Sequence, residues 1–122
     1  MKELFIFDGN CGFCTKTVDY LIKLDRNKLV DFIPYQVFEK SSEQEYACDF
    51  SKSIVYIENR QYFTGARGFM KFLDRITGLS LFSRIYNFPL LGSCMEAVYR
   101  LVAKNRRYLP GTTPWCDRQD NC

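Results

Sequence analysis

A short apolar run near the N-terminus, Leu4-Phe5-Ile6-Phe7, is followed at once by Asp8-Gly9-Asn10. A continuous apolar run that ends in turn-forming residues is typical of a buried strand. Apolar positions then recur at steps of three and four over residues 14–24, which predicts a helix with Asn10 as its N-cap. Residues 29–35 predict a second strand. Strand, helix and strand in this order form a βαβ unit, whose two strands run parallel.

The rest of the chain predicts a hairpin and further helices. Residues 53–58 and 61–64 are expected strands, joined by the two-residue turn Asn59-Arg60. A helix is expected over residues 65–77, and a short helix or connector over 79–87. Residues 39–52 predict a loop that could contain a short helix. A last helix is expected to start at a capping box, Ser93 with Glu96, and to end near residue 107, with an inward face made of Ala97, Val98, Leu101 and Val102.

This order of elements predicts an α/β fold. A β-α-β unit, a β-β-α unit and an extra C-terminal helix form a four-stranded mixed sheet flanked by helices, which is the thioredoxin-like arrangement. The 122 residues suffice for one domain with a core and are too few for two. We expect this domain to span residues 1–112, and residues 113–122 to be a C-terminal tail that packs through Trp115. The apolar runs are too short for a transmembrane helix.

Cysteine carries the candidate chemistry. The chain has six cysteines and no histidine, which excludes Cys-His and Ser-His nucleophilic pairs and His-ligated metals. Cys11 and Cys14 fall where the first strand passes into the helix. Unpaired N–H groups and the helix dipole at such an N-terminus favour a thiolate, and the second cysteine lies one turn further on. We therefore predict Cys11 as the nucleophile and Cys14 as the resolving thiol.

Three neighbours of the two cysteines are candidate site residues. Asp8 could relay the proton of the resolving thiol, or it could hydrogen-bond the backbone of the turn. Gly12 is expected to leave the first thiol accessible, and Phe13 to contact a bound partner.

Residues 7–14, Phe-Asp-Gly-Asn-Cys-Gly-Phe-Cys, resemble the signature of the DCC family, predicted thiol-disulfide oxidoreductases with Asp-x-x-Cys-x-x-Cys near the N-terminus. The resemblance continues over residues 32–36, 53–57 and 65–66. Residues 99–108 are similar to the family's C-terminal Tyr-x-x-x-Ala-x-Asn-Arg element. The resemblance implies a thioredoxin-like fold and a redox role for Cys11 and Cys14, and it names no substrate.

Two further candidates follow from this comparison. Thioredoxins and glutaredoxins place a cis-proline before the third strand, where this chain has Ser51-Lys52-Ser53, so we expect Ser53 to take its place and offer a hydroxyl. Asn105 and Arg106 could bind an anionic group, such as a glutathione carboxylate. They could equally be a helix cap and a surface cation.

We therefore expect a thiol-disulfide oxidoreductase that acts on a disulfide-bearing protein or a small thiol. It would need no organic cofactor, and glutathione or another thiol would reset it. No signal peptide is recognisable, so we expect the cytoplasm, and we expect no nucleic-acid partner. Cys48 and Cys94 are expected to be core or incidental residues, and Cys116 and Cys122 to be idle thiols, a tail disulfide or a second redox pair.

Three alternatives stay open. Residues 60–107 carry nine basic and two acidic side chains, so the chain could be a redox-sensing or interaction module that binds a protein or an anionic surface. It could be a zinc-binding domain, although the spacing of the remaining cysteines is unfavourable. It could also be a disulfide scaffold.

Overall fold

The structure is a computed structural model that describes residues 3–41 and 53–119. In this part of the chain the elements follow one another as β1 (Glu3–Phe7), α1 (Gly12–Leu24), β2 (Val30–Pro34), α2 (Tyr35–Ser41), β3 (Val55–Glu58), β4 (Gln61–Thr64), α3 (Gly65–Thr77), α4 (Leu81–Asn87), α5 (Leu91–Lys104) and α6 (Trp115–Gln119). No helix in these residues is both long and apolar enough to span a membrane.

The four strands form one mixed sheet in the order β2-β1-β3-β4. β1 pairs parallel with β2 and antiparallel with β3, which pairs antiparallel with β4. Asn59 and Arg60 both have positive φ angles, 50° and 66°, as a two-residue hairpin turn requires. The predicted thioredoxin-like fold, with its extra C-terminal helix, is confirmed.

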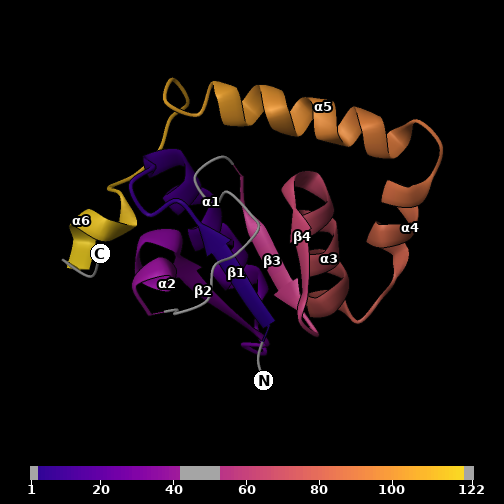
Figure 1. Cartoon of the computed structure of the whole chain (residues 1–122), viewed down its shortest axis with the longest axis horizontal. Coiled ribbons are helices and arrows are strands. Elements are labelled where there is room, and N and C mark those ends of the chain that lie inside the picture. The colour runs from indigo at the N-terminus through magenta and orange to yellow at the C-terminus, as the bar shows by residue number, and fades with distance from the viewer. Residues whose placement is uncertain (1–2, 42–52, 120–122) are drawn as a thin grey trace.

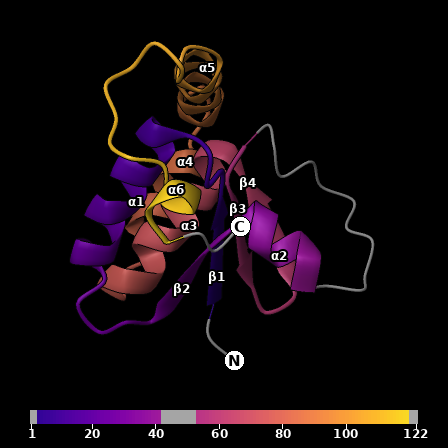
Figure 2. The same ribbon diagram turned by 90° about the vertical axis from the view of Figure 1, so that its left-hand side faces the viewer.

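Helices cover both faces of the sheet (Figures 1 and 2). α1 and α3 lie on one face, over a core of aromatic rings. Phe5 and Phe72 are its centre, with ring centroids 5.4 Å apart and planes inclined at 68°, a favourable edge-to-face arrangement. α2 lies on the other face, where Phe38 packs against Ile6 and Val55. α5 crosses one end of the molecule as its outermost element (Figure 1).

One expected helix cap is wrong, and one helix begins earlier than expected. The first helix is capped by Cys11 and not by Asn10. The backbone of Cys11 is extended, and its sulfur accepts a hydrogen bond from the Cys14 N–H. The second strand ends at Pro34, where a proline is expected to end it. A helix begins directly after it at Tyr35, four residues before the expected loop that could contain a short helix. The remaining residues of the expected loop, 42–52, lie outside the described residues.

The last long helix differs most from expectation. α5 begins at Leu91 rather than at Ser93, and the carboxylate of Glu96 does not form a capping box. It accepts hydrogen bonds from the Arg67 N–H and the Tyr86 hydroxyl, at 3.2 and 3.1 Å. Of the residues expected to face inward, Ala97 and Leu101 are exposed, whereas Val98 and Val102 line an apolar cavity beneath the helix, Val98 while 61% exposed.

Candidate active site

The site forms at one edge of the sheet, where two parallel strands end together. Phe7 of β1 pairs with Pro34 of β2, so the residues that follow each strand lie side by side. Asp8 starts a tight turn in which its carbonyl accepts the Cys11 N–H at 3.3 Å and its carboxylate accepts the Asn10 N–H at 3.0 Å. The turn delivers Cys11 to the N-terminus of α1.

Cys11 and Cys14 are free, half-buried thiols on the first turn of α1. The Cys11 sulfur accepts the backbone N–H of Cys14 at 3.2 Å. This N–H belongs to the group of donors that a helix leaves unpaired at its N-terminus. A negative charge on the Cys11 sulfur is therefore met by a fixed donor and by the positive end of the helix dipole.

Cys14 has a different environment. Burial raises its pKa to about 12, and the hydrogen bond and charge of Cys11 act in the same direction. Arg106 opposes them, because its guanidinium lies 3.7 Å from the Cys14 sulfur. Cys14 is therefore a neutral thiol at neutral pH, with one cation beside it that favours its ionisation.

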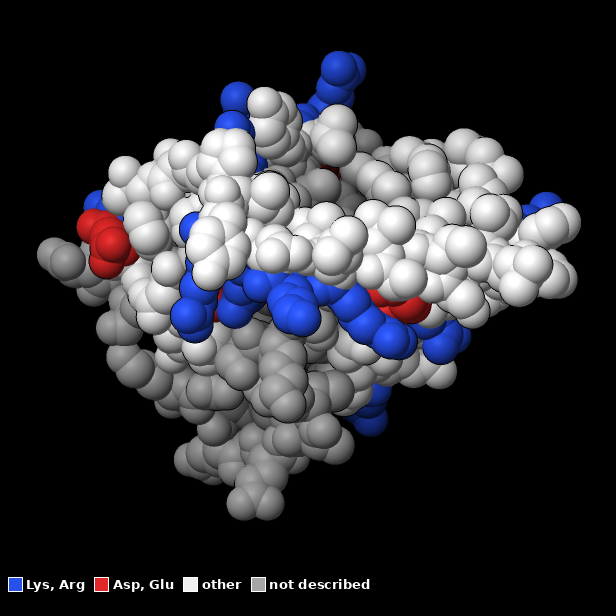
Figure 3. All heavy atoms as spheres, turned by 90° about the horizontal axis from the view of Figure 1, so that it is seen from above, with Lys and Arg blue, Asp and Glu red and all other residues white. Residues whose placement is uncertain are grey.

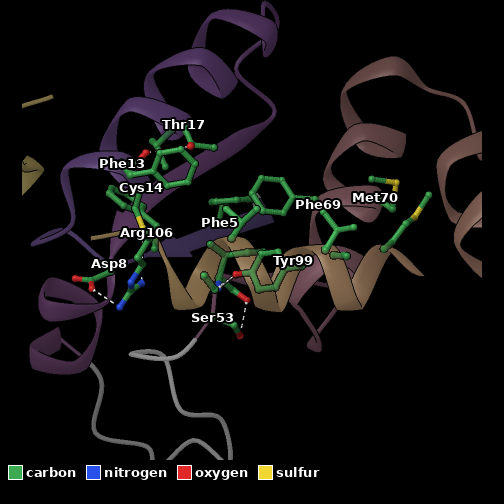
Figure 4. Close-up of a pocket in the computed structure, with 18 of the residues that line it drawn as sticks. Phe5, Asp8, Phe13, Cys14, Thr17, Ser53, Phe69, Met70, Tyr99 and Arg106 are labelled. Carbon is green, nitrogen blue, oxygen red and sulfur yellow. Dashed lines mark hydrogen bonds and ion pairs between the residues drawn. The ribbon is translucent and has the colours of Figure 1, made fainter. Parts of the chain in front are cut away.

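A hydrogen-bonded network holds that cation in place (Figure 4). Arg106 Nη2 lies 3.0 Å from Asp8 Oδ2, and both side chains are largely buried. The amide of Gln36 donates to Asp8 Oδ1 at 2.9 Å and accepts the Gly9 N–H at 3.0 Å. The carboxylate of Asp8 thus joins the turn before Cys11 to the cation beside Cys14.

Of the other predicted site residues, Arg106 belongs to this network, whereas Asn105 and Ser53 have local backbone contacts. Asn105 caps α5, since its amide donates to the Leu101 carbonyl at 2.8 Å, whereas Arg106 is the partner of Asp8 and not a surface cation. Ser53 donates to the carbonyl of Ile54 at 3.3 Å. The described residues contain no cis peptide bond, and the N–H of Ile54 is bound by the Tyr99 hydroxyl at 2.9 Å.

Gly12 faces the segment that follows α5. Its carbonyl accepts the Thr112 N–H at 3.2 Å, and a Cβ at this position would lie 2.5 Å from the Thr112 carbonyl oxygen. The glycine is therefore required by this close backbone approach. Whether it also gives substrates access to Cys11 stays a prediction.

An apolar cavity of about 540 Å³ extends from the site beneath α5. Phe13, Cys14 and Arg106 line it at the C-terminal end of that helix (Figure 4). Leu91, Met95 and Val98 line it further toward the N-terminus of the helix. Phe69 of α3 and Val18 of α1 complete its walls. The side chain of Phe13 thus contributes to the inner wall of the site.

Sequence reasoning missed two residues of the site. Gln36 donates a hydrogen bond to Asp8. The sequence predicts that the first two strands run parallel, so the residues that follow each strand could have been expected to lie close together. Thr15 is fully buried one turn after Cys11, donates to the Cys11 carbonyl at 2.9 Å and accepts the Trp115 N–H at 3.0 Å. Trp115 also packs edge-on against Phe7, so its predicted packing is confirmed.

The remaining cysteines divide into two kinds. Cys94 is free and exposed on α5. Cys116 is buried, disulfide-bonded and close to Gly9, so the expectation of an idle thiol is wrong for this residue. Cys48 and Cys122 lie outside the described residues. Within residues 3–41 and 53–119, no group of three or more His, Cys, Asp or Glu side chains could hold a metal ion.

Comparison with known proteins identifies one family. Residues 5–112 match the family described as DCC1-like thiol-disulfide oxidoreductase. The uncharacterized protein YuxK of Bacillus subtilis (strain 168) is 27% identical over 125 residues, which cover 99% of this chain and 85% of YuxK. No solved structure matches the chain significantly. Because the match spans most of the chain and includes the cysteine pair, this protein belongs to the DCC1-like thiol-disulfide oxidoreductase family.

Proposed function

We propose that the protein exchanges disulfides through a dithiol cycle in which Cys11 attacks and Cys14 resolves. The observation that carries this proposal is the asymmetry of the pair. The Cys11 sulfur accepts a backbone N–H at the start of α1, whereas Cys14 is a buried thiol whose pKa is raised to about 12. The nucleophile in thiol exchange is the thiolate, so the environment of Cys11 suits the attack.

The cycle transfers two electrons to the substrate. The Cys11 thiolate attacks one sulfur of the substrate disulfide, that disulfide breaks, and a mixed disulfide forms as the first substrate thiolate leaves. Cys14 then loses its proton and attacks the Cys11 sulfur, which releases the second substrate thiolate. The protein is left with a Cys11–Cys14 disulfide, and an external thiol of the glutathione class returns it to the dithiol. The cycle requires no organic cofactor.

Asp8 and Arg106 support the second step. The Arg106 guanidinium, 3.7 Å from the Cys14 sulfur, stabilises the thiolate that must form there. Asp8 holds the guanidinium at 3.0 Å. We therefore propose Asp8 as a positioning residue through Arg106. If Asp8 instead relays the proton, Asp8→Asn should slow exchange with a changed pH profile, while Cys14 keeps its alkylation rate.

Three single variants test the cycle. Cys14→Ser should accumulate a mixed disulfide at Cys11 when incubated with oxidised glutathione, because no resolving thiol remains. Cys11→Ser should lose exchange. Cys94→Ser removes another free cysteine, which is exposed and lies on α5, and should exchange like the unsubstituted protein. Mass spectrometry of alkylated peptides identifies the reacting cysteine. Unchanged turnover of Cys11→Ser, or a mixed disulfide on Cys14 in the unsubstituted protein, would contradict the assignment.

We also propose that the substrate is a disulfide-bearing protein or a small disulfide, reduced in the cytoplasm. A glutathione redox titration tests the direction of exchange. A potential near that of thioredoxin, roughly −270 mV, would support a reductant, whereas a value near −120 mV would indicate an oxidant.

A further inference from the structure

Large apolar side chains are exposed together on α4, α5 and their flanking residues. Leu90 and Val98 are 80% and 61% exposed, and neither helix has a buried residue. The other exposed apolar residues of this region are Leu79, Leu81, Phe88, Leu91, Leu101 and Tyr108. Single exposed apolar residues are ordinary, but eight of them within residues 79–108 point to an interaction surface.

The pattern along α5 separates three faces. Leu91, Val98 and Leu101 recur at steps of seven and three and are exposed, so they form one apolar ridge. Leu91 and Val98 also line the cavity beneath α5, so the ridge runs along the exposed edge of that cavity. The inner face is fixed by Tyr99, whose hydroxyl binds the Ile54 N–H. Between the two lies a third face, a basic row of Arg100, Lys104 and Arg107, all exposed.

Figure 3 views the molecule from the side of α5 and shows a band of uncharged residues with a row of Lys and Arg side chains beside it. Residues 79–108 contain one acidic residue, Glu96. Its carboxylate is already bound to the Arg67 N–H and the Tyr86 hydroxyl. The positive charge of the row is therefore not balanced by acidic side chains of the same segment.

We propose that the α4–α5 face docks on an anionic membrane surface. A helix that carries an apolar ridge and a basic row suits this environment, because the apolar side chains enter the headgroup region while the cations meet anionic lipids. The projecting position of α5 at one end of the molecule fits a broad, flat surface (Figures 1 and 2). The helix would lie on the membrane, since no described helix could cross it.

The same charges disfavour a second copy of the chain as the occupant. Two such faces in contact would bring the basic rows of Arg100, Lys104 and Arg107 near each other without an acidic counterpart, and like charges across an interface are costly. An acidic protein partner would satisfy the row but would also need its own apolar groove for the ridge. An anionic bilayer supplies both properties at once.

Docking would have a consequence for the redox site, which rests on the proposed function. Arg106 follows α5 directly and contacts the Cys14 sulfur. The docked helix would thus hold the dithiol at the membrane surface. Its disulfide substrates would be proteins or small molecules that are concentrated there.

Co-sedimentation of the full chain with vesicles tests the proposal. One set of vesicles is phosphatidylcholine, and the other contains phosphatidylglycerol as the anionic lipid. We expect binding to the anionic vesicles that weakens with salt. Arg100→Gln with Lys104→Gln should weaken it about 30-fold, because each basic residue near the surface contributes about fivefold. Val98→Glu with Leu101→Glu should abolish it.

Matched controls come from α1. Ile22→Glu with Leu24→Glu changes two exposed apolar residues, and Lys16→Gln with Lys23→Gln removes two exposed cations, both away from the ridge. These controls should bind like the unsubstituted chain. Every substituted side chain is exposed, so the variants should fold, which circular dichroism checks.

Several results would overturn the proposal: no binding to either vesicle, equal salt-independent binding to both, or equal losses in the α1 controls. A dimer that Val98→Glu dissociates, without vesicle binding, would assign the ridge to a second copy instead. Vesicle binding does not require exchange activity. If Cys11→Ser keeps its exchange activity, the proposed cycle is wrong, but the vesicle result is unaffected. If the chain does not bind vesicles, the docking proposal is wrong, but the proposed cycle is unaffected.

Discussion

Replacing Arg106 with Met should make Cys14 harder to ionise. The guanidinium is 3.7 Å from the Cys14 sulfur. Two unit charges about 4 Å apart interact by about 4 kcal/mol at an effective dielectric constant near 20, which corresponds to about three pKa units. The carboxylate of Asp8, 3.0 Å from the same guanidinium, cancels part of this field. We therefore expect the pKa of Cys14 to rise further by roughly one to two units in Arg106→Met.

The assay measures alkylation of Cys14 by iodoacetamide in a Cys11→Ser, Cys94→Ser background, with mass spectrometry to follow the labelled peptide. Only the thiolate reacts, so the rate near neutral pH follows the thiolate fraction. We expect Arg106→Met to react about 10- to 100-fold more slowly. Arg106→Lys keeps the positive charge and should lose less. Alkylation in urea, where the site is unfolded, should be equal in all variants.

One result would refute the electrostatic argument. If Arg106→Met alkylates as fast as the parent while its circular dichroism spectrum and urea midpoint are unchanged, the guanidinium does not govern the ionisation of Cys14. Arg106 would then serve only to hold Asp8 and the turn before Cys11. Asp8→Asn should change the rate in the opposite direction. The asparagine side-chain oxygen still accepts from the guanidinium and keeps it in place, but the opposing negative charge is removed, so Cys14 should react faster.

Three further predictions concern stability. Phe72→Ala empties the centre of the fully buried ring cluster and should lower the free energy of unfolding by about 3–5 kcal/mol, measured by urea denaturation. Gly12→Ala places a Cβ 2.5 Å from the Thr112 carbonyl oxygen and should cost about 1–3 kcal/mol, with faster proteolysis after residue 112; an unchanged cleavage rate would contradict this packing. The raised pKa of Cys14 stabilises the reduced fold below about pH 9, and this contribution should be lost as pH rises toward about 12. Urea midpoints of the reduced protein should therefore fall with alkaline pH more steeply than those of Cys14→Ala.

The sheet and the helix that carries the cysteine pair follow from local patterns. The apolar run of β1 and the 3.6-residue period after it predicted a strand and a helix at nearly the observed bounds. Gly78 ends α3 with a φ of 74°, as expected of a C-terminal glycine. These features depend on neighbours in the sequence, so a single sequence contains them.

The charge network of the site depends on residues far apart in the chain. Asp8 and Arg106 are separated by almost the whole domain, and their ion pair exists only because α5 crosses over the N-terminus of α1. The sequence offered two roles for Arg106, a ligand for an anion or a surface cation. The sequence alone does not reveal that the anion beside Arg106 is the carboxylate of Asp8. Binding of a substrate anion by Arg106 stays a prediction.

The orientation of α5 shows why an amphipathic pattern is not enough to find a core. Val98 and Leu101 have the spacing of a buried stripe, and this was the basis for placing them inward. Val98 shares a helix face with Met95 and Val102, and all three line the cavity beneath α5, whereas Leu101 is exposed and does not line it. Periodicity alone does not fix where the inward part of a broad apolar face ends. That limit is set by polar anchors, Tyr99 on the Ile54 N–H and Glu96 on the Arg67 N–H, which fix one face against the domain. The apolar side chains that stay exposed on this helix are available for an intermolecular contact, and the basic row beside them is the ground for the proposed docking on an anionic surface.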